Sequence, residues 1–263
     1  LDRGDDAWHR RGQGFAGTGS VDPAPARAAL AAYEAAFRAR PDDPRVRFKL
    51  IEALYFEAWF TSDDEYHQRR TWDRILSLTE ELIAATQTGD AEGALGGRSS
   101  PSVTAGDEAE AHFWSAVAWG LYGMSHSKLK AAAKGVAERI RTHASRVIEI
   151  DPGLWDGGGY RLLGRLHTAT PKVPLVTGWL DRDEGIELLE RACEVSTDDP
   201  RNPYFLADAL LRHRPRERDR GLELLREVVA REPAPDRIVE DSETLADAAA
   251  TLAHWQRRLE QGR

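Results

Sequence analysis

The sequence has very little of several features that define whole classes of protein. It contains one cysteine, Cys193, and one methionine in 263 residues, so no disulfide can form within the chain. Runs in which Val, Ile and Thr alternate with polar residues are almost absent, which leaves little basis for β-sheet. No apolar run approaches the ~20 residues of a membrane-spanning helix. The composition therefore predicts an all-α chain.

An excess of positive charge is also missing. The formal net charge is −8, whereas proteins that bind nucleic acids need clustered Lys and Arg to neutralise phosphates. The basic cluster at residues 214–218 is interrupted by Glu217, which is typical of a solvated helix end. We therefore expect no nucleic-acid partner.

Motifs for catalysis and cofactor binding are equally scarce. The eight histidines show no close metal-site spacing, and there is no G-x-S-x-G elbow. Residues 12–19 contain a formal G-x-G-x-x-G match, but no strand precedes it, so we interpret it as a flexible lead-in segment. We expect no catalysis, no cofactor and no metal. An enzyme that holds a phosphate at residues 12–19 or at the turn 156–159 is the remaining alternative of that class.

Helix-forming residues dominate what is present. Ala, Leu, Arg and Glu are the most frequent types, and the hydrophobic spacing has helical periodicity. Ser125 is a candidate N-cap for the fifth helix, and Asp181 or Asp183 for the seventh. We predict about ten helices, at residues 24–40, 44–61, 64–86, 107–123, 127–150, 158–168, 182–195, 203–213, 218–231 and 241–260, with a further short helix possible within 2–11.

One spacing recurs and predicts repeats. A small residue is followed by a large apolar one four positions later, a small one three later, and Pro five beyond. The first three share one helix face and Pro ends the helix, as in the second helix of a tetratricopeptide (TPR) unit. The matches begin at Ala29, Ile140, Gly185 and Gly221. We therefore predict TPR-like helical hairpins, arranged as an α-solenoid or a compact α-α superhelix, that form a single domain at 24–263 after a lead-in segment at 1–23.

Two segments interrupt the repeats. Residues 87–106 are rich in Gly, Ser and Thr and predict a long flexible loop. Residues 171–180 insert about nine residues between the helices of one repeat. That segment is apolar but contains Pro and Gly, so we expect packing to order it and function to be placed there.

Aromatic residues suggest where a ligand or partner binds. Phe113 and Trp114 point about 100° apart on a helix, so one helix cannot bury them together with Trp119 and Tyr122 on a single narrow stripe. At least one should line a second surface, such as the concave groove of a solenoid, although core packing is the alternative for each residue. The candidates for this groove are Trp114, Trp119, Trp155, Tyr160 and Trp179.

The middle of the chain resembles a known family. The motifs are Ala111–Trp114, Ile150-Asp-Pro-Gly153, Gly157-Gly-Gly-Tyr-Arg-Leu-Leu-Gly164, Pro171 with Pro174, and Ala192 before Asp199-Pro200. Over residues 108–232 they resemble the T-component family of TRAP transporters (tripartite ATP-independent periplasmic transporters). The resemblance implies a TPR-like fold, export as a periplasmic lipoprotein, association with a periplasmic solute-binding protein, self-association and handling of a small organic ligand. The family's lipid-attachment cysteine is not in this sequence, so we expect it upstream of Leu1.

Three functions therefore stand side by side. The first is a non-catalytic accessory protein of TRAP-type uptake, which binds a solute-binding protein. The second is a generic TPR scaffold that docks peptides or proteins; the single asparagine, Asn202, counts against a version that clamps a carboxylate with Asn. The third is the phosphate-binding enzyme. A plain start without a signal segment would indicate a cytoplasmic protein instead of a periplasmic or lipid-anchored one.

Overall fold

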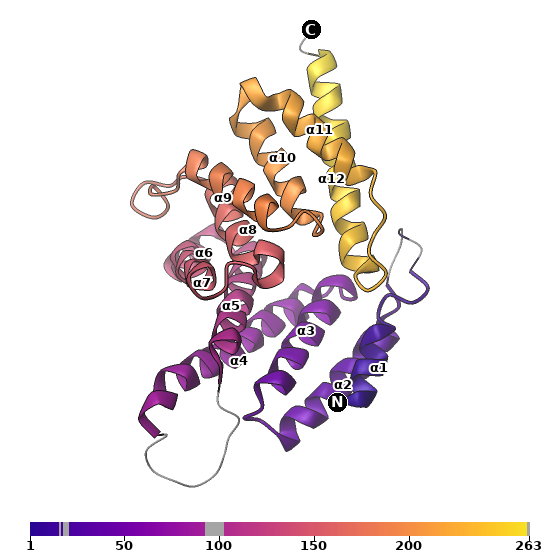
Figure 1. Cartoon of the computed structure of the whole chain (residues 1–263), viewed down its shortest axis with the longest axis vertical. Helices are drawn as coiled ribbons and strands as arrows, with labels where there is room; N and C mark the ends of the chain where they lie inside the picture. Colours follow the sequence, from indigo (N-terminus) through magenta and orange to yellow (C-terminus); the bar gives the residue numbers. More distant parts are fainter. Residues whose placement is uncertain (16, 18–20, 93–102, 262–263) are drawn as a thin grey trace. The chain divides into compact units, whose positions relative to one another are not determined.

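The computed structural model describes residues 1–15, 17, 21–92 and 103–261, and this part of the chain is helical without strands. The contacts divide the chain into two compact units, Leu1–Asp151 and Pro152–Arg263. Figure 1 shows the helices of both units. The fold is therefore all-α, as the composition predicts.

The first unit contains seven helices within the described residues. The helices α1 to α5 pack chiefly against their neighbours along the chain, whereas α7 packs against α5 and only weakly against the short α6 between them. Where the connection is short, as between α2 and α3, consecutive helices form a hairpin. The helices are α1 (Asp2–His9), α2 (Pro23–Ala39), α3 (Pro44–Phe60), α4 (Glu65–Glu92), α5 (Ala105–Ser125), α6 (Lys128–Ala133) and α7 (Val136–Ile150).

The second unit continues the same pattern. The helix pairs α8 with α9 and α10 with α11 pack most closely, and α12 lies against α11 and α10. The helices are α8 (Leu154–Ala169), α9 (Arg182–Val195), α10 (Arg201–His213), the short 3-10 helix η1 (Pro215–Glu217), α11 (Arg218–Val229) and α12 (Ile238–Gln261).

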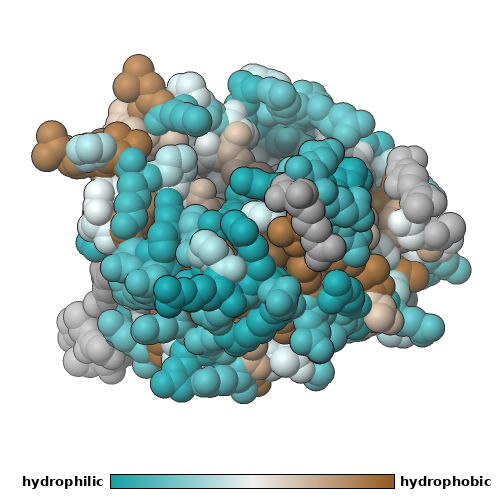
Figure 2. All heavy atoms as spheres, turned by 90° about the horizontal axis from the view of Figure 1, so that it is seen from above, coloured by the Kyte–Doolittle hydropathy of each residue, from teal (hydrophilic) through white to brown (hydrophobic). Residues whose placement is uncertain are grey.

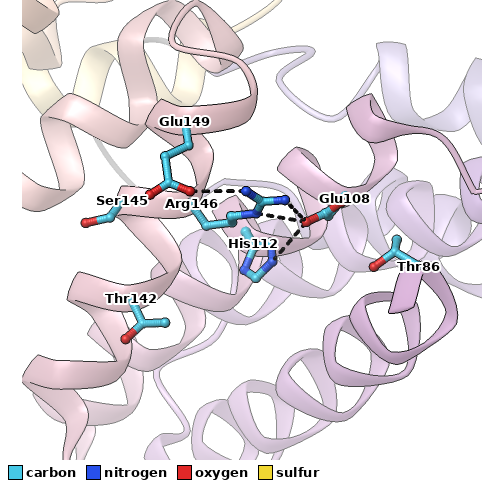
Figure 3. Close-up of a pocket in the computed structure, with 7 residues that line it drawn as sticks. All are labelled: Thr86, Glu108, His112, Thr142, Ser145, Arg146 and Glu149. Carbon is cyan, nitrogen blue, oxygen red and sulfur yellow. Dashed lines mark hydrogen bonds and ion pairs between the residues drawn. The ribbon is translucent and has the colours of Figure 1, made fainter. Parts of the chain in front are cut away.

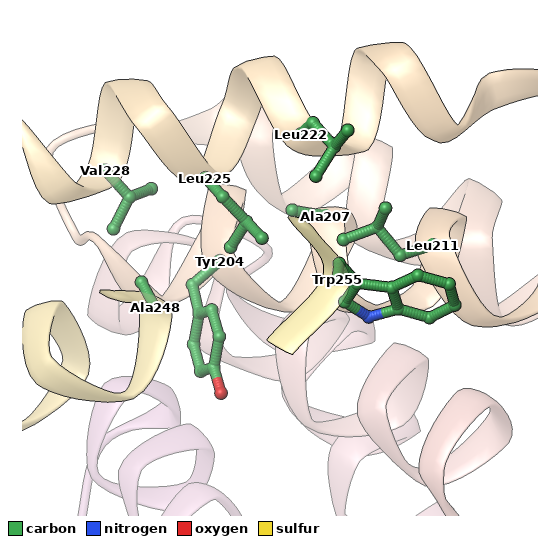
Figure 4. Close-up of a cluster of buried hydrophobic side chains, with 8 residues drawn as sticks. All are labelled: Tyr204, Ala207, Leu211, Leu222, Leu225, Val228, Ala248 and Trp255. Atoms are coloured by element: carbon green, nitrogen blue, oxygen red, sulfur yellow. The ribbon is translucent and has the colours of Figure 1, made fainter. Parts of the chain in front are cut away.

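Glycine and proline spacing positions the helices of the second unit. A Cβ on Gly185 of α9 would lie 2.6 Å from Cβ of His167 on α8, so a side chain there would push the two helices apart. A Cβ on Gly221 of α11 would lie 2.9 Å from Leu211 of α10. Both glycines are thus required by a close helix approach. Figure 4 shows the resulting core between α10, α11 and α12, where Leu225 and Val228 are fully buried and Trp255 nearly so.

Several predicted boundaries are wrong for identifiable reasons. The predicted helix 127–150 is two helices, because Gly135 adopts a left-handed conformation between α6 and α7. The N-cap of α6 is Ser127, not Ser125. The N-cap of α9 is Asp181, one of the two residues predicted for it. Residues 87–92 and 105–106 of the predicted loop are helical, and residues 93–102 lie outside the described part.

The opening residues pack on the first unit. The helix α1 lies inside the predicted lead-in segment and contacts α2. Tyr33 of α2 donates a hydrogen bond to Asp5 at 2.8 Å, and Lys49 of α3 forms an ion pair with the same carboxylate at 3.0 Å. These contacts join three helices. No helix in the described ranges has both the length and the hydropathy needed to cross a membrane.

Candidate functional site

The insertion between α8 and α9 forms a self-supporting loop. Thr177 is buried; its hydroxyl donates to the carbonyl of Pro171 at 2.7 Å and accepts from the backbone N–H of Val173 at 2.8 Å. The backbone N–H of Thr177 donates to the carbonyl of Val173. These bonds close the loop on itself, so its conformation is fixed by its own groups.

The two ends of this loop are anchored to the second unit. Trp179 packs edge-on against His167 of α8, with ring centroids 5.4 Å apart, and Leu180 is 1% exposed. Arg182 at the start of α9 donates to the carbonyls of His167 and Thr170. The expectation that packing orders the insertion is therefore confirmed at its base.

The tip of the loop differs from that expectation, because it is not packed. We define the loop tip as Val173, Leu175 and Val176, whose residues are 47%, 105% and 40% exposed. Leu175 also has a φ of +65°, a left-handed conformation that costs a non-glycine residue about 1–2 kcal/mol. Figure 2 shows hydrophobic atoms that project from the surface at the upper left of the view. The molecule thus holds apolar side chains in water on a strained but well-anchored support.

The glycine-rich turn at the start of α8 is strained as well. Trp155, Asp156 and Gly157 adopt φ values of 50°, 57° and 75°. Asn202 of α10 donates to the carbonyl of Asp156 at 2.8 Å, and Arg161 donates to the carbonyl of Trp155 at 3.2 Å. The backbone carbonyls of a strained turn are therefore held by two buried side chains.

Ion pairing also holds Arg161 beside the strained turn. Arg161 is 3% exposed; its Nη1 lies 2.7 Å from Oδ1 of Asn202 and 3.2 Å from Oδ2 of Asp199. Burial and the nearby Arg201 lower the pKa of Arg161 to about 10. Burial would raise the pKa of Asp199, but Arg161 and Arg201 outweigh it and hold that pKa below its usual range. Both groups are therefore charged at neutral pH, and they bind each other.

The first glycine of this turn, Gly157, is explained by packing. A Cβ on Gly157 would lie 3.2 Å from both Cα of Ala192 and Cβ of Val195 on α9. The turn therefore faces α9 at this position, so close helix packing gives the Asp156–Gly159 segment a role apart from phosphate binding. Part of the other glycine-rich segment, residues 16 and 18–19, lies outside the described residues.

The five residues predicted for a groove are distributed over both units. Trp114 and Trp119 lie on α5 of the first unit and are each 6% exposed. Trp114 packs against Tyr55 of α3 with centroids 5.5 Å apart, whereas Trp119 lies under Arg139 of α7 at 4.6 Å. The two indoles therefore face different helices and do not line one surface.

Trp155, Tyr160 and Trp179 belong to the second unit. Trp155 is 38% exposed in the strained turn, Tyr160 is half-buried, and Trp179 lies at the base of the loop. Trp155 is at the first turn of α8, while Trp179 packs on the last turn through His167. These two residues are at opposite ends of the helix.

A cleft in the first unit gathers ionisable side chains that sequence reasoning did not single out. It has a volume of about 570 Å³. Arg146 of α7 contacts Glu108 of α5 at 2.9 Å and Glu149 at 3.1 Å, and Figure 3 shows both contacts. One guanidinium therefore meets two carboxylates. The lining residues are Thr86, Glu108, His112, Thr142, Ser145, Arg146 and Glu149.

Two histidines pair beside this cleft. Nδ1 of His112 lies 2.8 Å from Nδ1 of His143, so one ring donates a hydrogen bond to the other. Burial lowers the pKa of both, that of His143 to about 4 with the help of His112. The pair is thus neutral at pH 7. In the described part of the chain, no three His, Cys, Asp or Glu side chains are placed to hold a metal ion.

Sequence signals for these groups exist but are weak. Glu108 and His112 have the i,i+4 spacing of neighbours on a helix, yet the contact of Glu108 with Arg146 spans 38 residues. No protein-family model matches this chain and no curated protein matches it, so the resemblance over residues 108–232 rests on its motifs alone.

Proposed function

We propose that this chain is a TPR-like, non-catalytic binding protein that serves TRAP-type solute uptake by docking to a periplasmic solute-binding protein. The observation that carries the docking role is the loop tip. Exposed apolar side chains on a rigid support are typical of protein interaction sites. The internal hydrogen bonds of Thr177 keep the tip ordered before binding, which reduces the entropy cost of association.

The glycine contacts support the TPR-like part of the proposal. Gly185 and Gly221 occupy the small-residue position of two successive matches to the TPR spacing, and each allows the second helix of a hairpin to approach the first. Leu189 and Leu225, four residues later, are fully buried. The same small-then-large arrangement thus recurs in α9 and α11, as a repeat requires.

A generic docking scaffold differs from this proposal only in its partner. The carboxylate-clamp version of such a scaffold has little support, because Asn202 is fully buried. Its amide donates to the carbonyls of Asp156, Ala192 and Ser196. The residue is committed to the strained turn and does not reach a peptide terminus.

Binding measurements with a solute-binding protein encoded beside this chain test the proposal. The tip variant combines Val173→Ser, Leu175→Asn and Val176→Ser; Asn tolerates the left-handed conformation of position 175. We expect calorimetry to show that the tip variant loses affinity by about tenfold or more, since buried apolar anchors each contribute over ~1 kcal/mol.

The control is Leu129→Ser in α6 of the first unit, because this variant removes an apolar side chain that is also highly exposed, at 82%, but lies outside the loop tip. This control should bind like the wild type. If the wild-type chain binds no such solute-binding protein, the transport role is wrong. If the tip variant binds as tightly as the wild type, the loop tip is not the docking surface.

A further inference from the structure

A second cleft lies within the second unit, between α10 and α12. Its volume is about 450 Å³, within the range of small-molecule sites. Ala250 of α12 contributes a small side chain to the lining. Figure 4 shows that Trp255, another lining residue, lies beside Leu211 in the core of the second unit. The lining residues are Asp208, Arg212, Ala250, Thr251, His254, Trp255 and Arg258.

The carboxylate of this cleft is already occupied by two arginines. Asp208 is 1% exposed. Its Oδ2 accepts from Arg165 at 2.5 Å and its Oδ1 from Nε of Arg212 at 2.6 Å. Within the described residues, the two terminal nitrogens of Arg212 have no further partner. They are available as donors to a ligand.

Arg258 adds a second cation, which no carboxylate of the described residues pairs with. Its guanidinium lies 5.0 Å from the ring centroid of Trp255, and no carboxylate of the described chain is within ion-pair distance of it. Asp247 lies on the same helix, but Arg165 is the cation that acts on it. A chain with a net charge of −8 therefore has a local excess of guanidinium groups here.

We propose that this cleft binds a small organic acid that carries an aromatic or short aliphatic group. Guanidinium groups bind carboxylates through paired, charge-assisted hydrogen bonds, and Arg212 and Arg258 supply these donors. Ala250 and the small exposed part of Trp255 supply the apolar part of the lining. Thr251 contributes a hydroxyl that also lies 3.4 Å from the hydroxyl of Tyr204. The inference deepens the binding role proposed above by naming a ligand class, but it does not depend on the protein partner.

Calorimetry on the full chain at low salt tests this site with phenylacetate and its neutral isostere phenylacetamide. We expect phenylacetate to bind and the amide to bind at least about tenfold more weakly, because hydrogen bonds between guanidinium groups and a charged carboxylate are stronger than those to a neutral amide. Arg258→Gln should weaken phenylacetate binding by about tenfold. Ala250→Leu should abolish it by filling the cleft.

The matched control is Arg257→Gln, an exposed neighbour on α12 that does not line the cleft; it should bind phenylacetate like the wild type. Positions 250, 257 and 258 are all exposed, so an unchanged melting temperature should accompany each variant.

The inference is overturned if phenylacetamide binds equally well, if Arg257→Gln weakens binding as much as Arg258→Gln, or if no acid binds. A phenylalanine-ending peptide that binds while phenylacetate does not would assign the cleft to peptide termini instead. None of these results bears on the loop tip, whose test uses a protein partner.

Discussion

The cleft between α5 and α7 and the cleft between α10 and α12 have similar volumes and opposite charge. In the first, Arg146 meets two carboxylates. In the second, Asp208 meets Arg165 and Arg212 while Arg258 stays outside any described ion pair. The net charge of the chain predicts neither. After local pairing, the lining of the first cleft therefore has one carboxylate more than guanidinium groups, and the second has an excess of guanidinium groups.

Burial separates the arginines of the two units even more than pairing does. Arg146 has two acidic partners, but its side chain is 44% exposed, whereas Arg161 and its partner Asp199 are 3% and 2% exposed. Exposed pairs contribute little because water screens them. Removing one member of a buried pair leaves a charge in a medium that solvates it poorly.

The largest expected effect follows from this contrast. Arg161→Leu should lower the free energy of unfolding of the second unit by about 3–5 kcal/mol, since it also leaves the carbonyl of Trp155 without its donor. Hydrogen exchange followed by mass spectrometry checks this, because it reports on α8 to α12 separately from the first unit.

Arg146→Leu is the matched variant, and the first unit should lose less than about 1 kcal/mol. Equal losses for the two variants would show that burial does not distinguish these arginines. A stable Arg161→Leu variant would mean that Arg201 alone can neutralise Asp199.

The two units also differ in what surrounds some of their carboxylates. The buried carboxylates Asp199 and Asp208 of the second unit both face arginines. Glu110 of the first unit instead faces Glu52, and burial together with that neighbour raises its pKa to about 7, although a hydrogen bond from Trp114 opposes the rise. The folded first unit therefore holds a proton that the unfolded chain releases near pH 4.5.

The raised pKa of Glu110 makes the free energy of unfolding depend on pH. Between about pH 4.5 and pH 7 the folded state binds more protons at Glu110 than the unfolded state does, so this residue costs stability as the pH rises. Glu110→Gln removes that cost. We expect no gain at pH 4.5 and a gain of about 2 kcal/mol at pH 8, below the ~3 kcal/mol of the full shift because the side chain is partly solvated.

Urea unfolding of the wild type and Glu110→Gln at pH 4.5, 6 and 8 measures this gain. The depressed pKa values of His112 and His143 destabilise the folded state as the pH falls below about 6.5, but they act in both proteins and cancel in the difference. A gain that is the same at each pH would show that Glu110 is ionised normally.

The sequence predicted the helices better than the sites. Hydrophobic periodicity located α9 to the residue and the core positions Leu189 and Leu225, because both depend on local spacing. The break at Gly135 was missed, since glycine is tolerated inside helices until a left-handed conformation is required. The local sequence pattern thus predicts which residues are helical, but it does not predict whether a helical segment is one helix or two.

The candidate sites depend on contacts that no local pattern encodes. Arg161 meets Asn202 across 41 positions and Arg165 meets Asp208 across 43, so neither pair could be read from spacing. The aromatic residues were visible, but an indole in the core and one in a groove look alike in sequence. Trp114 and Trp119 are accordingly buried against different helices, and the cleft residues Arg212 and Arg258 were not proposed.

The smallest expected effect concerns two helix glycines, one in each unit. Gly120 of α5 has open space where a Cβ would lie, whereas a Cβ on Gly164 of α8 would come within 2.9 Å of the carbonyl of Gly185. Gly120→Ala should stabilise the first unit by about 0.5–1 kcal/mol through helix propensity. Gly164→Ala should destabilise the second by about 1–2 kcal/mol, because a backbone atom cannot move aside cheaply. Hydrogen exchange measures the stability of each unit in both variants. If Gly164→Ala also stabilised its unit, α8 and α9 would not be as closely packed as described.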